Sequence, residues 1–336
     1  MNTLLDLISF ALKGVVVVVA VLLVTGIVVA LLRRTRRDEA RLTVHKLNDR
    51  FRDLADGLRS VVLQPKAWKR HLAVTKRAAK HPKEAEHRIF VLDFRGDMAA
   101  SAVISLREEI SAILGVCRAG DEVVVRLESS GGIVQAYGLA ASQLARLKGR
   151  DLKLVVCVDK IAASGGYMMA CLADELIAAP FAVIGSIGVV APVPNINKLL
   201  LEHGVEYDEM TAGEFKRTVS VLGKISPEGR AKFQTQLEET HGLFKDFVRE
   251  HRPGLDIDAV ATGEYWFGKR ALEKKLVDRL LTSDDYLLAQ CAKADLFLVS
   301  YKPREPWRRR LVEAVGESAT RLVHKGWSEM RELLPM

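Results

Sequence analysis

Apolar and polar residues form two kinds of block along the chain after residue 88. Short apolar runs rich in valine predict buried strands, and longer stretches with apolar residues every three or four positions predict helices. Three strand-then-helix pairs follow one another: Ile89 to Asp93 with Ala102 to Val116, Glu122 to Leu127 with Val134 to Leu147, and Leu152 to Val158 with Ser164 to Ala173. Such repeats predict an α/β fold in which helices cover a parallel sheet.

Two later stretches complete the pattern. A long helix is predicted from about Pro227 to Arg249, because Ser226 suits the N-cap and proline suits the first helical position. The stretch from Leu176 to Val193 carries no charge over 18 residues, but two prolines and two glycines interrupt it. These breakers favour a buried strand and turn over a membrane-spanning helix.

The amino-terminal part has a different pattern. From Val15 to Leu32, 18 consecutive residues carry no charge, which is enough for a helix to span the hydrocarbon core of a bilayer. A cleaved signal peptide is the alternative, but the run is long for one and no small-residue cleavage site follows it. We interpret this segment as a permanent transmembrane anchor.

Charge adds one point to this picture. The 336-residue chain has a formal net charge of +8, and the segment from Arg33 to Arg88 holds 17 Lys and Arg against 7 Asp and Glu. The excess therefore lies beside the predicted anchor, where it meets anionic lipid headgroups, and it does not indicate nucleic-acid binding. By the positive-inside rule, the arginines after the anchor put the rest of the chain in the cytoplasm.

These patterns divide the chain into four parts. Residues 1–37 form the anchor and its basic flank, 38–87 a charged helical stalk, 88–300 the folded domain and 301–336 a basic amphipathic tail. The surroundings of the four cysteines predict buried thiols, with a single disulfide left open. Neither these cysteines nor the histidines have the spacing of a metal site, so we expect no metal and no organic cofactor.

The residues that carry chemistry lie at the predicted carboxyl ends of strands. Ser164 stands between an apolar strand and an apolar helix, in the stretch Ala162-Ala163-Ser164-Gly165-Gly166. A serine at this place can simply cap the helix. The same place suits a nucleophile, because the free N–H groups of the first helical turn stabilise a developing oxyanion.

Glycines near Ser164 are the candidate oxyanion hole. Gly131 and Gly132 follow the second predicted strand, just as Gly165 follows the third. A tight turn with positive φ would explain the first pair by itself. The functional interpretation is that a bare backbone admits a peptide substrate, and that the N–H groups of Gly131 and Gly165 receive its oxyanion.

Lys216, which comes 52 positions after Ser164, is the candidate base. A lysine base must be neutral, and this requires burial away from carboxylates. Phe215 suits an apolar setting, whereas Glu214 and Arg217 indicate contact with water, so a surface lysine is the alternative. A histidine base is less favoured, because no histidine after the serine has a distinctive motif around it.

Together these residues resemble the signal peptide peptidase A family of membrane-anchored Ser-Lys proteases, most strongly from Ile89 to about Asp278. The segment around Ser164 is similar to the family's nucleophile motif, and Gly213 to Arg217 is similar to its general-base motif. Gly185 to Val189 is similar to the segment whose serine hydrogen-bonds the catalytic lysine. The resemblance therefore implies Ser186 as a third site residue.

The resemblance also implies a fold, an assembly and a location. The fold is of the ClpP/crotonase type, built from repeated β-β-α units, and members assemble into rings, here expected to be octameric, in which serine and lysine can come from different subunits. The location is the bacterial plasma membrane with the domain outside the cytoplasm, opposite to the charge rule, so the side stays open. Ser130 and Lys275 replace a proline and a glycine of many members, and neither touches the proposed chemistry.

The expected function is that of a serine endopeptidase. Ser164 attacks a peptide carbonyl, Lys216 takes its proton, and Ser186 orients the lysine. The substrates are peptides, such as remnants of signal peptides or membrane-associated polypeptides. A membrane scaffold that has kept the fold and lost proteolysis is the alternative, and an acyl-CoA enzyme of the crotonase type is a more distant one.

Overall fold

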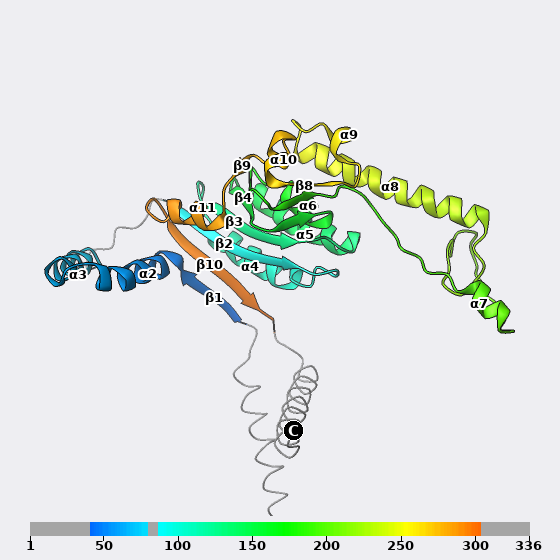
Figure 1. Cartoon of the computed structure of the whole chain (residues 1–336), viewed down its shortest axis with the longest axis horizontal. Helices are drawn as coiled ribbons and strands as arrows, with labels where there is room; N and C mark the ends of the chain where they lie inside the picture. The colour runs from blue at the N-terminus through cyan, green and yellow to red at the C-terminus, as the bar shows by residue number, and fades with distance from the viewer. Residues whose placement is uncertain (1–40, 80–86, 304–336) are drawn as a thin grey trace, which may run out of the picture. The chain divides into compact units, whose positions relative to one another are not determined.

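The computed structural model describes residues 41–79 and 87–303 (Figure 1). The predicted anchor, residues 15–32, and most of the predicted tail lie outside these ranges, so both stay predictions. Among the helices of the described ranges, none combines the length and the apolar character that crossing a bilayer requires.

In the described part of the chain, ten strands form one mixed sheet. Seven follow the order β1-β10-β2-β3-β4-β6-β9, and β5, β7 and β8 form a short branch beside β3. Pairing is parallel from β10 through to β9 and antiparallel between β7 and β8. The strands are β1 Arg41–Lys46, β2 Arg88–Gly96, β3 Glu122–Ser129, β4 Lys153–Val158, β5 Ile161–Ala163, β6 Glu175–Ala178, β7 Val183–Gly185, β8 Tyr265–Phe267, β9 Arg279–Leu280 and β10 Asp295–Lys302.

The helices confirm the α/β class. The three predicted pairs are β2 with α4, β3 with α5 and β4 with α6, and the short β5 between β4 and α6 was not predicted. The ClpP/crotonase type stays a prediction from the resemblance. The helices are α2 Leu47–Val62, α3 Pro65–Ala79, α4 Val103–Val116, α5 Val134–Lys148, α6 Gly165–Ala170, α7 Asn197–Glu202, α8 Pro227–His251, α9 Ile257–Val260, α10 Gly268–Glu273 and α11 Ser283–Gln290.

Both faces of the central strands are buried. Along β3, Val123 and Val125 lie in the core that α4, α5 and α6 complete, whereas Val124 lies in the smaller core on the other face, with Tyr286 and Leu287 of α11. Strands that are covered on both faces read as continuous apolar runs. This is why the central strands were predictable.

Two other predictions are confirmed. The uncharged stretch from residue 176 to 193 holds β6, a turn and β7, and not a membrane helix. Helix α8 begins as expected, with the Ser226 hydroxyl accepting a hydrogen bond from the Gly229 N–H at 2.9 Å. All four cysteines are free, so no disulfide forms. The expectation of buried thiols is confirmed for Cys157 and Cys171 and is wrong for Cys117 and Cys291, which are half-buried.

The predicted stalk is helical only in part. It begins with β1, which pairs with β10 at the edge of the sheet. Thr43 donates its hydroxyl to the Ser300 carbonyl at 3.2 Å, and Lys46 pairs with Asp295 at 2.7 Å. The spacing of apolar residues in this segment predicted helix throughout, but it carries no information on a strand whose partner lies some 250 residues later.

Candidate active site

Ser164 occupies a strained turn between strand and helix. It follows β5 and precedes α6, with φ 51° and ψ −120°, in a region that residues other than glycine rarely adopt. Such a conformation costs on the order of 1–3 kcal/mol and persists only where the surrounding structure enforces it. Nucleophilic serines of other hydrolases stand at strand-to-helix turns of this kind.

The capping explanation for Ser164 does not apply. Its side chain makes no capping hydrogen bond to the first turn of α6. Its backbone is fixed instead, because its N–H donates to the Gly185 carbonyl at 2.8 Å and its own carbonyl accepts from the Met168 N–H at 3.0 Å. The Ser164 hydroxyl is therefore held on a rigid turn and does not cap α6.

Ser164 lines an apolar cavity of about 340 Å³. Met168 lies beside it on α6, and α5 and α8 provide the two larger walls. The wall residues from these two helices are Val134, Gly138, Ala141, Ser142, Thr240, Leu243, Phe244 and Phe247. Because the lining is mostly apolar, the cavity suits an aliphatic or aromatic group more than a charged one.

Gly131 touches the Ser164 turn directly. Its φ is 87°, and a Cβ added to it would lie 2.7 Å from the Ser164 Cβ and 2.8 Å from the Gly165 nitrogen. No side chain fits there, so the glycine is required by a close approach and not only by its turn. The structure thus brings Gly131, Ser164 and Gly165 together, as the sequence predicted.

The Gly131 N–H is not free in this structure. It donates to the Ser129 hydroxyl at 3.1 Å, inside the protein. The Gly165 nitrogen, by contrast, begins α6, where the first N–H groups of a helix have no intrahelical partner. The two predicted oxyanion donors therefore differ, because the Gly131 N–H already has an acceptor and the Gly165 N–H has none within its helix. The sequence did not indicate this difference.

Ser186 lies beside Ser164. Ser164 directly follows Ala163 of β5, and Ser186 directly follows Gly185 of β7. Ala163 and Gly185 are in register in this parallel strand pair. Neighbouring strands are about 4.8 Å apart, so the two serines are adjacent. Ser186 also has a positive φ, 52°, and its N–H donates to the Glu264 carbonyl at 2.7 Å.

Lys216 is the one predicted site residue that the chain does not bring to Ser164. It is exposed. Phe215 next to it lies under the Lys232 ammonium of α8, 5.6 Å from the ring centroid. The cavity is bounded by Thr240 to Phe247, farther along the same helix. At 1.5 Å per residue these places are about 12 to 22 Å apart along α8. The expectation that Lys216 is buried against the serine is wrong within one chain, and its role stays a prediction.

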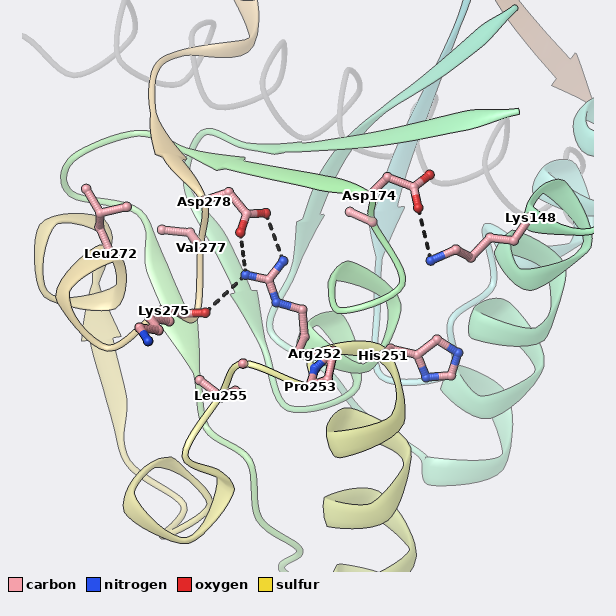
Figure 2. A pocket seen from close by; sticks show the side chains of 12 residues that line it. Lys148, Asp174, His251, Arg252, Pro253, Leu255, Leu272, Lys275, Val277 and Asp278 are labelled. Carbon is pink, nitrogen blue, oxygen red and sulfur yellow. Dashed lines mark hydrogen bonds and ion pairs between the residues drawn. The ribbon is translucent and has the colours of Figure 1, made fainter. Parts of the chain in front are cut away.

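A second cavity, of about 510 Å³, is lined by two ion pairs (Figure 2). Figure 2 shows Arg252 directed at Asp278, which it contacts through two hydrogen bonds of 2.7 and 2.8 Å, and at the Lys275 carbonyl, 3.0 Å away. Lys148 pairs with Asp174 at 3.2 Å on the other side. The Arg252–Asp278 pair fixes the end of α8 to the sheet, because Asp278 also accepts the Leu176 N–H at 2.7 Å.

Replacing Asp278 with asparagine should lower the free energy of unfolding at pH 7 by about 2–3 kcal/mol, since Arg252 then loses its charged partner. Burial alone would raise the pKa of Asp278, but the hydrogen bonds from Arg252 and the Leu176 N–H outweigh it and hold this pKa below its usual value. A depressed carboxyl pKa gives stability that is present at neutral pH and is lost as the pH falls below about 4. Urea unfolding at pH 7 and at pH 3 measures both effects.

The matched control is Asp246→Asn, which removes the exposed partner of Arg249 on the same helix and should change stability by less than about 0.5 kcal/mol. If Asp278→Asn loses as much stability between pH 7 and pH 3 as the unmodified chain does, the ion pair is not the source of the acid sensitivity.

Sequence reasoning missed several residues around Ser164. Phe244 and Phe247 were recognised only as part of a long structural helix, yet they form a wall of the cavity. Ser129 precedes the predicted glycine turn and was not singled out, and Tyr137 had no distinguishing signal. The position of Ser129, at the end of a buried strand and directly before the turn, was a signal that could have identified it.

Two family models match this chain. The model described as peptidase family S49 N-terminal matches residues 2–144, and the peptidase family S49 model matches residues 146–296. "Probable protease SohB" of Haemophilus influenzae is 45% identical over 331 residues, covering 94% of each chain. A protein of the same name from Buchnera aphidicola subsp. Acyrthosiphon pisum is 52% identical over 71% of this chain and 70% of that one. Among solved structures, a mutant of the membrane-bound stomatin-specific protease 1510-N is similar with a TM-score of 0.40 and 12% identity, over 61% of this chain and 85% of that one.

Proposed function

This chain belongs to peptidase family S49, and from that premise we propose that it is a membrane-anchored serine endopeptidase with Ser164 as its nucleophile. One observation carries the proposal: a serine in a strained strand-to-helix turn, not used for capping, lines an apolar cavity beside Gly131. The anchor is the uncharged segment from Val15 to Leu32, in a bacterial plasma membrane. The membrane face that carries the domain is left open.

The proposed reaction passes through an acyl-enzyme. The Ser164 Oγ attacks the peptide carbonyl carbon while Lys216 accepts the hydroxyl proton. The N–H groups of Gly165 and Gly131 stabilise the oxyanion. Lys216 then protonates the leaving amine, water hydrolyses the ester, and Ser186 orients the lysine throughout.

We further propose that Lys216 acts on Ser164 of a neighbouring subunit in a ring-shaped homo-oligomer. Lys216 is exposed and remote from the serine of its own chain. It lies in residues 189–226, here called the arm. The arm carries apolar side chains that its own domain leaves uncovered, among them Leu199 at 52%, Leu201 at 57% and Met210 at 96% exposure. A second copy of the chain would cover them and complete the site.

The apolar lining of the cavity favours peptide substrates with a bulky apolar residue on the acyl side of the cleaved bond. Gly138→Leu should test this, because a Cβ at Gly138 meets no atom within 4 Å and the new side chain would fill the cavity. We expect kcat/KM to fall by about 10–100-fold for peptides with leucine or phenylalanine at this position, and by much less for alanine. Peptide substrates that differ only at this residue measure the effect.

The matched control is Gly115→Leu, at an equally open glycine near the end of α4 that lies away from the cavity. If Gly138→Leu lowers kcat/KM equally for peptides with a large and with a small acyl-side residue, the cavity does not bind that residue.

A catalytically silent membrane scaffold is the second candidate. The observations that favour it are the remote Lys216 and the occupied N–H of Gly131. A fluorophosphonate probe applied to the intact, membrane-extracted oligomer separates the two functions. Covalent labelling at Ser164 supports the protease, and a lack of labelling in an intact oligomer supports the scaffold.

A further inference from the structure

A chain of buried hydroxyl groups lies beneath the Gly131 turn. The Gly131 N–H donates to the Ser129 Oγ at 3.1 Å, this oxygen lies 2.6 Å from the Tyr137 hydroxyl, and the latter donates to the Asp97 carbonyl at 2.8 Å. Ser129 and Tyr137 are 2% and 0% exposed. We call these two side chains the hydroxyl relay.

The protons of the relay can be assigned by counting donors. Tyr137 has a single hydroxyl proton, and it is given to the Asp97 carbonyl. Ser129 must then supply the proton between the two hydroxyl groups, and its lone pairs remain to accept the Gly131 N–H. Burial raises the pKa of Tyr137, so its hydroxyl stays protonated and can act as this donor. All bonds of the relay therefore run in one direction, from Gly131 to Asp97.

The end of the relay is fixed to the backbone. The carboxylate of Asp97 accepts the Ser101 N–H at 2.8 Å and the Ser101 hydroxyl at 2.6 Å, which closes the turn after β2. The next residue, Met98, accepts the Ile133 N–H at 2.9 Å, directly after the two glycines. The Gly131 turn is thus tied to this loop through the relay and through its own backbone.

Close packing leaves the relay no alternative position. A Cβ on Gly96 would lie 2.3 Å from the Tyr137 hydroxyl and 2.5 Å from the Ser129 Oγ, so only glycine fits beside it. A Cβ on Gly165 would lie 2.4 Å from the Tyr137 Cγ. The same tyrosine therefore supports both predicted oxyanion donors, Gly165 through its ring and Gly131 through its hydroxyl.

We propose that Ser129 and Tyr137 are positioning residues for the oxyanion hole, which hold the Gly131 N–H beside Ser164 until substrate takes it over. This inference rests on the proposed function. The Ser129 Oγ satisfies the N–H in the absence of substrate, through a neutral hydrogen bond of ordinary length. A developing oxyanion is the stronger acceptor, because charge-assisted hydrogen bonds are about twice as strong as neutral ones. Ser129 then remains satisfied through Tyr137.

Two variants remove the relay with little change in packing. Tyr137→Phe deletes only the hydroxyl and keeps the ring under Gly165, and Ser129→Ala deletes the acceptor of the Gly131 N–H. Each should lower kcat for peptide hydrolysis by about tenfold or more, with KM within about twofold, because an oxyanion donor acts in the transition state. The double variant should lose little more than Ser129→Ala alone, since the two hydroxyl groups act as one unit.

The chain provides a matched control in Tyr167→Phe. Tyr167 is equally buried, and its hydroxyl donates to the Leu276 carbonyl at 3.0 Å, without a link to Gly131. This variant should be destabilised as Tyr137→Phe is, and should keep its kcat. Unchanged kcat in both relay variants would overturn the inference, as would an equal fall in kcat for the Tyr167 control.

A second measurement separates this inference from the proposed function. If the unmodified oligomer neither cleaves peptides nor reacts with a fluorophosphonate, the protease proposal fails whatever the relay variants do. Hydrogen exchange of the Gly131 amide then tests the relay by itself. Faster exchange in Ser129→Ala than in the unmodified chain supports the relay, and unchanged exchange overturns it.

Discussion

Replacing Ser164 with alanine should abolish peptide hydrolysis, with a fall in kcat on the order of 10⁴-fold or more. The proposed acyl-enzyme cannot form without the Ser164 Oγ. The fold should be unaffected, because the strained turn is held by the backbone bonds of residue 164 to Gly185 and Met168 and not by its hydroxyl. The measurements are peptide cleavage, fluorophosphonate labelling and thermal unfolding of the same preparation.

Ser111→Ala is a suitable control, since Ser111 is an exposed serine on α4 away from the cavity. Cleavage that survives in Ser164→Ala and is absent from a mock purification would show that another residue is the nucleophile. Loss of folding in Ser164→Ala would instead mean that the hydroxyl has a structural role that the described contacts do not reveal.

Two inactive variants should restore activity when they assemble together. Lys216→Ala alone should lose most peptide hydrolysis, because no base remains for Ser164. If serine and lysine come from different subunits, co-expression of Ser164→Ala and Lys216→Ala chains places an intact serine beside an intact lysine at about a quarter of the sites in randomly mixed rings. Activity of mixed oligomers, isolated through two different affinity tags, measures this fraction.

Lys224→Ala, at another exposed lysine of the arm, is the control and should keep full activity by itself. Mixed oligomers without activity, from variants that each assemble normally, would mean that both residues act within one chain. The arm would then have to move by about the distance that now separates Phe215 from the cavity along α8.

The central fold was predictable because its signals are local. Strands β2, β3 and β4 are buried on both faces, so their apolar runs stand out, and Ser226 and Pro227 marked the start of α8. Strand β1 was not predictable. Its six residues are nearly all exposed, and only the pairing with β10 makes them a strand. Non-local pairing of this kind leaves no periodic trace in the sequence.

The site was predictable to a different extent. The residues found together, Ser164, Gly165, Gly131 and Ser186, all lie at the carboxyl ends of strands, where a parallel sheet gathers them. Tyr137 comes from the first turn of a helix and reaches the site only through tertiary packing. Lys216 is exposed and lies remote from this edge of the sheet, so parallel strand order did not place it.

The pairing of β1 with β10 has a consequence for where the chain can be truncated. Asn48, just after β1, donates to the Ala294 carbonyl at 2.8 Å and accepts the Leu296 N–H at 2.8 Å. A truncated form that starts at Arg88 would lose both β1 and Asn48, and would leave the backbone of β10 unpaired along its outer side. Open strand edges recruit other chains, so such a fragment would be prone to aggregate. The smallest form suited to purification therefore begins at or before Arg41.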